Sequence, residues 1–114
     1  MKDKEWTKVG SVGVDAGLMM IGDPSYSIGA NPSNDWITDD WDDFCRELFN
    51  SQEFAEHQVV NVPFSLGHEG AAVVTSTGFG DGSYDVFVKY SDEGEWGRRV
   101  AEAKIVFIED EEIE

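Results

Sequence analysis

Residues 71–90 read AAVVTSTGFGDGSYDVFVKY, and this stretch carries the clearest strand signals in the chain. Ala71–Phe79 and Ser83–Tyr90 are rich in β-branched and aromatic residues, as is typical of strands. Between them, Gly80-Asp81-Gly82 suits a tight turn that needs positive φ, so the stretch predicts a β-hairpin. Because side chains alternate along a strand, one face of the second strand holds Tyr84, Val86, Val88 and Tyr90.

Further apolar segments on both sides of this stretch also predict strands. Val9–Val14 and Leu18–Gly22 flank Asp15-Ala16-Gly17, a turn-forming group that predicts a second hairpin. Gln58–Phe64 and a segment from about Arg99 to Ile108 complete the set. We therefore expect a mainly β (α+β) fold: an antiparallel sheet or partly open β-barrel or sandwich of about six strands, with one packed amphipathic helix.

One segment has helical periodicity instead. Apolar residues recur at positions i, i+3, i+4, i+7 and i+8, namely Trp41, Phe44, Cys45, Leu48 and Phe49. Thr38 precedes them as a predicted N-cap, and acidic residues crowd the first turn, where the helix dipole favours negative charge. We expect this helix to continue to about Glu56, because Phe54 is compatible with the same face.

Length and charge limit the classes of partner. A chain of 114 residues suits one domain, residues 1–114, in which the acidic residues 109–114 form a frayed tail. Eight Lys and Arg stand against 24 Asp and Glu, which gives a net charge of −16. Such a field repels phosphate backbones and anionic lipids, so we expect no direct contact with nucleic acid or membrane; basic proteins or cations are favoured.

Cysteine content and the N-terminus indicate the compartment. Cys45 is the one cysteine, so no disulfide within the chain is expected. The first residues, MKDKE, lack the apolar run of a signal peptide. We therefore expect a cytoplasmic protein.

Three motifs together resemble a known family. They are VGVDAG at 12–17, IGDPSY at 21–26 and STGFGDGSYDVFV at 76–88. The set is similar to a family of uncharacterised bacterial and bacteriophage proteins with VDxG, GDPxY and SxGxGDGSYxV motifs. The resemblance implies a small β-rich fold and a bacterial or phage setting, which would be the host cytoplasm for a phage protein, but no reaction. Its motif residues become ligand-binding candidates: Asp15, Asp23, Asp81 and Tyr84.

The chain lacks the usual signatures of catalysis and of cofactor or metal binding. The glycines at 78–82 precede a predicted strand, whereas a phosphate-binding loop leads into a helix. His57, His68 and Cys45 are isolated in sequence, so structural zinc is not expected. Four acidic residues near the predicted hairpin leave calcium open, namely Asp81, Asp85, Asp92 and Glu93, but no segment fits an EF-hand loop, so no metal and no cofactor is assigned. His68 is the best isolated catalytic candidate, although an exposed surface histidine is the more frequent case. No catalytic residue is therefore assigned.

The acidic and aromatic segment DWITDDWDDF at 35–44 carries the functional prediction. Carboxylates along an exposed helix can imitate a row of phosphates, and tryptophan is enriched at interface hot spots. The partner-binding candidates are Asp35, Trp36, Asp39, Asp40, Asp42 and Asp43. The simpler interpretation is that the apolar stripe is core and the acids form its solvated face.

Three functions remain open at this level. The first is a non-enzymatic acidic protein of phage or bacterial origin that inhibits a basic nucleic-acid-handling host protein by charge mimicry. The second is a small-ligand-binding, sequestering protein with a pocket near the four motif residues. The third is a hydrolase with an unrecognised carboxylate site.

Overall fold

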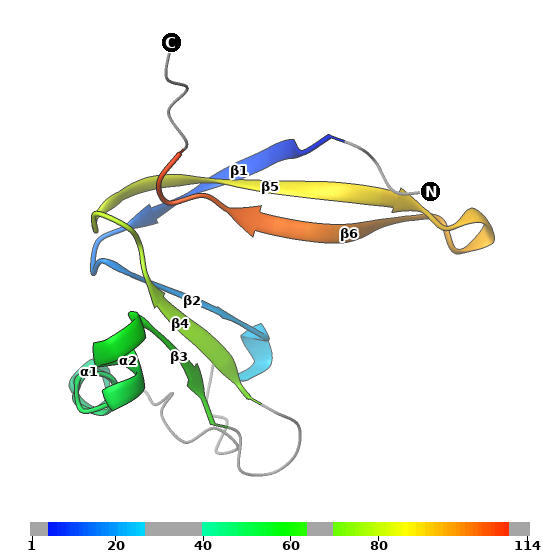
Figure 1. Ribbon diagram of the computed structural model, residues 1–114. Coiled ribbons are helices and arrows are strands. Elements are labelled where there is room, and N and C mark those ends of the chain that lie inside the picture. Colours follow the sequence, from blue (N-terminus) through cyan, green and yellow to red (C-terminus); the bar gives the residue numbers. More distant parts are fainter. Residues whose placement is uncertain (1–4, 27–39, 64–69, 110–114) are drawn as a thin grey trace. The chain divides into compact units, whose positions relative to one another are not determined.

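The computed structural model describes residues 5–26, 40–63 and 70–109 (Figure 1). Their contacts divide the chain into two compact units, one formed by residues 1–17 with 77–114 and the other by residues 18–76. Each unit contains one three-stranded antiparallel sheet. The expectation of a mainly β fold with about six antiparallel strands is confirmed, and in the described residues the strands form two open sheets instead of a closed barrel.

The first unit is built around a long central strand. Strand β5 (Gly82–Asp92) pairs with β1 (Thr7–Val14) on one side and with β6 (Arg98–Ile105) on the other. A short 3-10 helix, η2 (Gly94–Trp96), closes the β5–β6 hairpin (Figure 1). One face of this sheet carries basic side chains over aromatic rings, with Lys89 and Lys104 lying 4.9 and 4.3 Å from the ring centroid of Trp6.

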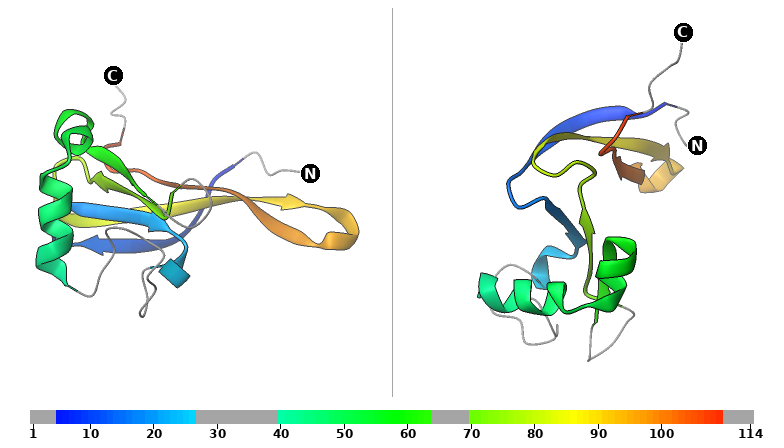
Figure 2. Two further views of the ribbon diagram at one scale, coloured as in Figure 1. Left: turned by 90° about the horizontal axis from the view of Figure 1, so that it is seen from below. Right: turned by 60° about the vertical axis from the view of Figure 1, so that its left-hand side comes forward.

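The second unit places its strands in the order β2-β4-β3. Strand β2 (Leu18–Gly22) leads into the 3-10 helix η1 (Pro24–Tyr26), and β4 (Ala72–Ser76) lies between β2 and β3 (Val59–Val62). Two helices, α1 (Trp41–Phe49) and α2 (Gln52–His57), precede β3 (Figures 1 and 2). Neither of these described helices is long and apolar enough to cross a membrane.

The core of the second unit lies between its sheet and its helices. Its buried residues are Leu48, Val60, Val62, Ala71, Ala72 and Val74, and four half-buried side chains pack against them: Leu18, Tyr26, Phe44 and Phe54. Leu48 is 0% exposed and anchors α1 to the strands. Burial of one such side chain contributes about 1.5–3 kcal/mol, so α1, whose nine residues would be marginal alone, is held by this packing.

The prediction placed the helical segment correctly but misplaced both of its ends. Asp40, and not Thr38, caps α1, because its carboxylate accepts hydrogen bonds from Asp42 N at 2.9 Å and Asp43 N at 3.4 Å; Thr38 itself lies outside the described residues. The helix also ends earlier than expected. Ser51 starts α2 by accepting a bond from Phe54 N at 3.2 Å, so the chain turns between two helices instead of continuing one.

Both hairpins predicted from local turn signals are wrong. β1 pairs with β5, and β2 pairs with β4, so the turn at Asp15–Gly17 and the turn at Gly80–Gly82 both carry the chain between sheets. Instead of forming two hairpins, the segments at Asp15–Gly17 and 77–82 contact each other, and Thr77 N donates a hydrogen bond to Gly17 O at 3.3 Å. Gly17 has φ +68°, which suits this tight turn but does not decide its partner. The predicted frayed tail, residues 109–114, lies outside the described residues apart from Glu109.

Candidate functional site

The glycine-rich motif at 76–84 folds into a hydrogen-bonded turn. The buried Thr77 hydroxyl donates to Gly80 O at 2.7 Å, and Gly80 N donates to Thr77 O at 3.1 Å. The Tyr84 hydroxyl lies 2.9 Å from Thr77 O and 2.5 Å from Gly80 O, within donating distance of both carbonyls. The Tyr84 ring packs edge-to-face on Phe107, with 5.4 Å between centroids. We call Thr77, Gly80 and Tyr84 the turn network; it gives Tyr84 a structural role in the first unit.

Two of the predicted ligand-binding aspartates lie beside this network. Asp15 directly follows Val14, whose sheet partner is Gly82, so Asp15 and Asp81 come to the same end of the sheet. Both side chains are exposed. Within the described residues, no three or more His, Cys, Asp or Glu groups gather closely enough to hold a metal ion. The structure therefore brings Asp15, Asp81 and Tyr84 to one region of the first unit, around a turn.

The fourth candidate, Asp23, belongs to the second unit and lines a cleft there. Its carboxylate accepts a hydrogen bond from Ser25 N at 2.9 Å, which fixes the start of η1 at the end of β2. The cleft is open and has a volume of about 360 Å³. Its lining residues come from β2, η1, β3 and the start of β4: Ile21, Gly22, Asp23, Tyr26, Asn61, Gly70, Ala71, Ala72 and Val73.

Small residues open this cleft. A Cβ on Gly22 would lie 2.8 Å from Ala71 O and 2.9 Å from Ala72 Cβ, so the end of β2 leaves no room for a side chain at this position. A Cβ on Gly70 would lie 2.2 Å from Asn61 Oδ1, and Gly70 has φ +134°. The Asn61 carboxamide therefore rests against bare backbone at the edge of the cleft.

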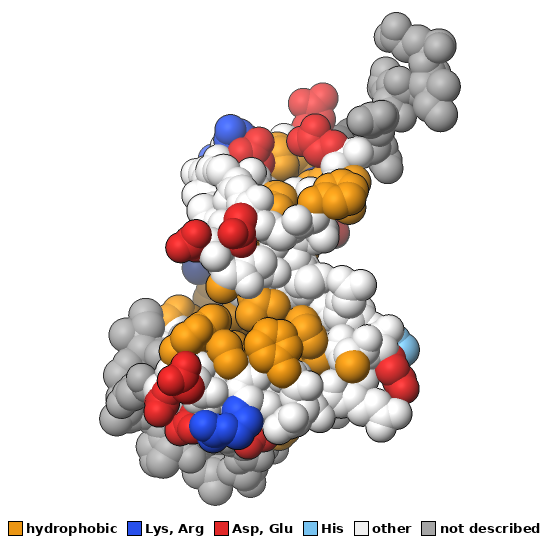
Figure 3. All heavy atoms as spheres, turned by 90° about the vertical axis from the view of Figure 1, so that its left-hand side faces the viewer, with side chains coloured by type: hydrophobic (Ala, Val, Ile, Leu, Met, Phe, Trp, Pro, Cys, Tyr) orange, Lys and Arg blue, Asp and Glu red, His pale blue; other side chains and the backbone are white. Residues whose placement is uncertain are grey.

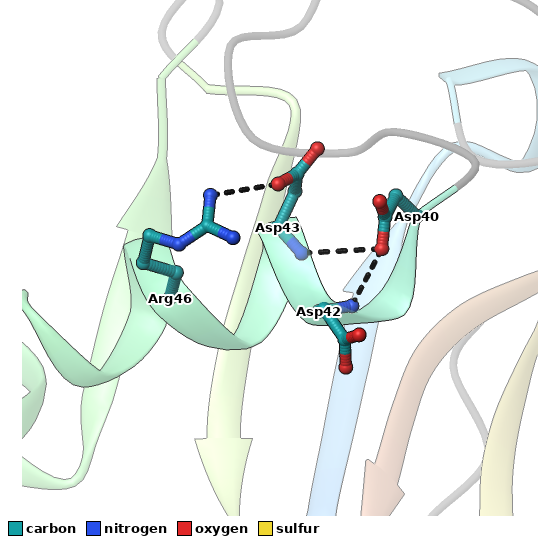
Figure 4. A network of polar contacts seen from close by, with 4 residues as sticks. All are labelled: Asp40, Asp42, Asp43 and Arg46. Carbon is teal, nitrogen blue, oxygen red and sulfur yellow. Dashed lines mark hydrogen bonds and ion pairs between the residues drawn. The ribbon is translucent and has the colours of Figure 1, made fainter.

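The acidic start of α1 is partly neutralised within the helix itself (Figure 4). Asp40 is occupied as the cap, and Asp43 Oδ1 accepts a charged hydrogen bond from Arg46 Nη1 at 2.7 Å. That bond and the charge of Asp43 raise the pKa of Arg46, which stays a cation. Asp42 is exposed. Of the other partner-binding candidates, Asp35, Trp36 and Asp39 lie outside the described residues.

Aromatic side chains of α1 reach the surface next to these acids. Trp41 is 56% exposed and stacks on Phe44 with 5.6 Å between ring centroids, while Phe49 is 67% exposed and meets Phe54 edge-on. Asp42 and Phe49 are seven residues apart, so they lie on one face of the helix. Trp41 lies about 80–100° around the helix from this pair, in line with the buried Leu48 but exposed at the start of α1. We call the three exposed residues Trp41, Asp42 and Phe49 the outer face of α1. Figure 3 shows apolar side chains gathered near acidic ones in this unit.

This arrangement divides the predicted apolar stripe. Leu48 is buried and Phe44 and Cys45 are half-buried, as a core stripe requires, but Trp41 and Phe49 are exposed. Cys45 is a free thiol, and the exposed His57 ends α2, 3.8 Å from Glu56. His68 lies outside the described residues.

Charge is unevenly distributed between the two units. Seven of the eight Lys and Arg residues belong to the first unit, whereas the sequence from Leu18 to Ser76 has Arg46 alone, against ten Asp and Glu. Since Arg46 is paired with Asp43, the second unit presents an almost purely negative set of side chains.

The sequence did not indicate the place of three residues, two of the cleft and one of α1. Tyr26 stands in the GDPxY motif, so the motif could have identified it, but Asn61 has no local signal because only strand pairing brings it to the cleft. Trp41 was assigned to the core by its helical spacing, yet it is more than half exposed. Its position in the first turn, next to the cap, is the signal that could have indicated exposure.

Comparison with family models places the chain in one family. The chain belongs to the family described as "Protein of unknown function (DUF4241)", whose model matches residues 1–111. No match was found among curated proteins or among solved structures. Membership agrees with the expected resemblance to an uncharacterised family.

Proposed function

We propose that this protein is a binding protein whose second unit engages a basic partner protein through the outer face of α1. The observation that carries the proposal is the combination of two exposed aromatic rings, Trp41 and Phe49, with the exposed carboxylate Asp42 in a unit whose only cationic residue is Arg46. Interface hot spots pair an aromatic anchor with a charged rim, and this face offers both.

The proposal extends to the class of partner. A basic protein that handles nucleic acid has a surface built to receive phosphates, and the negative second unit would compete for that surface by charge mimicry. Because Asp40 and Asp43 are already occupied within α1, the mimicry depends on the exposed Asp42 of the outer face, on Glu47, which is exposed on another side of the helix, and on the field of the whole unit. The setting is a bacterial cytoplasm, or that of a phage-infected host.

Capture from a bacterial lysate tests the proposal. The immobilised protein should retain a basic protein that elutes with rising salt and is released by short duplex DNA, because exposed charge pairs are screened and the DNA competes for the same surface. Retention of no basic protein, or retention indifferent to salt, would contradict it.

Matched variants locate the surface on the purified partner. Trp41→Ala should weaken binding by about 2 kcal/mol, roughly thirtyfold, as expected for an aromatic anchor. Trp96→Ala is the control, because Trp96 is 70% exposed but lies in η2 of the first unit; it should change affinity less than about twofold, which is the scale of a residue outside the interface. Equal losses in the two variants would exclude α1 as the binding surface.

The charge contribution is tested in the same way. Asp42→Asn with Glu47→Gln removes two exposed carboxylates of α1, each contributing about 0.5 kcal/mol at low salt, so binding should weaken roughly fivefold. Glu95→Gln with Glu109→Gln removes the same charge from exposed positions of the first unit. An equal effect of both pairs would mean that only net charge matters.

A further inference from the structure

The cleft in the second unit has the volume and lining of a binding site for a small group. Its volume of about 360 Å³ is at the lower end of the range for ligand pockets, which limits the occupant to a small molecule or to one side chain. Its floor is apolar, with Ala71, Ala72 and Val73 of the β4 segment and Ile21 of β2. Three polar side chains from two segments stand around this floor: Asp23 and Tyr26 at the end of β2 and in η1, and Asn61 in β3.

The electrostatics of the cleft select a cation. Among the described residues that line the cleft, Asp23 is the one charged residue, and the sequence of the surrounding unit contains ten acidic residues against one basic residue. An anion would meet both the carboxylate and the field of the unit, whereas a cation is attracted by both.

The polar groups are fixed before any ligand arrives. The bond from Ser25 N orients the Asp23 carboxylate, and the Tyr26 ring packs against the core of the unit. Asn61 is set by the pairing of β3 with Val73 and by its seat on Gly70. A preorganised site loses little conformational entropy on binding, so even a small ligand can be retained.

The combination of groups indicates which cation fits. A carboxylate beside an aromatic ring is the usual arrangement for recognising ammonium groups, and a carboxamide oxygen can accept one of the ammonium hydrogens. The apolar floor suits a short alkyl chain. A divalent metal ion is disfavoured because it requires several oxygen ligands, and the described lining residues contain a single carboxylate.

We propose that this cleft binds an alkylammonium group, with Asp23 as the counter-ion, Tyr26 as the aromatic wall and Asn61 as a hydrogen-bond acceptor. A free amine and the side chain of a lysine share this chemistry. The described lining of the site contains no residue of the outer face of α1, so this proposal does not depend on the partner proposed for that face.

Titration of the ¹⁵N-labelled full chain with n-butylammonium tests the proposal by nuclear magnetic resonance. The backbone amides of Gly22, Ala71 and Ala72 should shift with a dissociation constant in about the millimolar range, as expected for a ligand of five heavy atoms. Two probes of similar size provide the controls: n-butanol lacks the charge and butyrate reverses it, and neither should shift these amides. Equal shifts from n-butanol, or shifts from Ca²⁺ alone and none from n-butylammonium, would overturn the proposal.

A matched pair of variants assigns the counter-ion. Asp23→Asn keeps an oxygen that can accept the bond from Ser25 N but removes the charge, so affinity for n-butylammonium should fall roughly tenfold. Asp42→Asn removes one charge from the same unit outside the cleft and should change affinity less than about twofold, as for a distant screened charge. Equal losses would refute the role of Asp23.

A further probe distinguishes the two sources of the group. Nα-acetyl-lysine methylamide presents the lysine side chain with its backbone amides. Binding at least as tight as that of n-butylammonium indicates a lysine of a partner protein, and markedly weaker binding indicates a free amine. If neither probe shifts the cleft amides, the proposal fails without recourse to any variant.

Discussion

The turn network allows a quantitative test by a double-mutant cycle on Tyr84→Phe and Thr77→Val. Tyr84→Phe removes one hydroxyl but leaves each carbonyl another donor, since Thr77 O keeps Gly80 N at 3.1 Å and Gly80 O keeps the Thr77 hydroxyl at 2.7 Å. The loss is therefore that of one ordinary hydrogen bond, about 1 kcal/mol, which corresponds to about 4 °C in melting temperature for a chain of this length. Thr77→Val should cost a similar amount.

The double variant carries the decisive expectation. With both hydroxyls removed, Gly80 O has neither side-chain donor, so its desolvation is no longer compensated. We expect the double variant to lose about 1 kcal/mol more than the sum of the single losses, because groups that share an acceptor are not additive. Leaving a buried carbonyl without a donor costs about 1–3 kcal/mol, and we take the lower end of this range for Gly80 O because Gly80 is half-buried.

Urea unfolding followed by circular dichroism measures these differences. Tyr90→Phe is the matched control: its ring would remain beneath Arg98, 3.8 Å from the guanidinium carbon, and no hydrogen bond of the Tyr90 hydroxyl occurs among the described contacts. The control should stay within about 0.5 kcal/mol of the parent, as for a surface change. Single losses that add to within about 0.3 kcal/mol would refute the shared role of Gly80 O.

Three further changes test the packing and electrostatics. Leu48→Ala should destabilise the protein by about 2–5 kcal/mol in urea unfolding, because it leaves a cavity in a fully buried site; a loss below about 1 kcal/mol would show that α1 is not anchored there. Asp40→Ala should cost about 0.5–2 kcal/mol and reduce helical circular dichroism through loss of the cap, and an unchanged spectrum would contradict the capping role. The Ser11 hydroxyl, and then Lys8, lower the pKa of Asp85, so its contribution to stability is present above its unfolded-state pKa of about 3.9 and disappears as the pH falls through the lower folded-state value. The free energy of unfolding of Asp85→Asn should therefore be lower than that of the parent near neutral pH, and the two values should converge in acid. A difference that persists in acid would refute this explanation.

The elements that sequence reasoning found are those decided by local pattern. The spacing of Phe44 and Leu48 located α1, and alternation along Ser83–Tyr90 located β5, whose observed bounds are Gly82–Asp92. The ends of α1 were misplaced because Thr38, Asp40 and Ser51 are all residue types that cap helices. Local chemistry can propose a cap, but it cannot choose among neighbouring candidates.

Strand pairing and the site required information that is not local. The turns at Asp15–Gly17 and Gly80–Gly82 were recognised as turns, but a turn shows that the chain changes direction and does not show which strand it meets next. β1 and β5 pair across most of the chain length, and β2 and β4 pair across the helices. For the same reason Asp23 was selected from its motif, whereas Asn61, its neighbour in the cleft, was not.

The most direct test of the proposed function maps the binding surface on the protein itself. The basic protein captured from lysate would be added to the ¹⁵N-labelled full chain, and backbone amide shifts would be followed along the sequence. The proposal predicts that the largest shifts fall on residues 41–49 of α1, and that Gly94–Trp96 in the first unit stay unperturbed. Shifts confined to the first unit, or spread evenly over both units, would contradict a binding surface on α1.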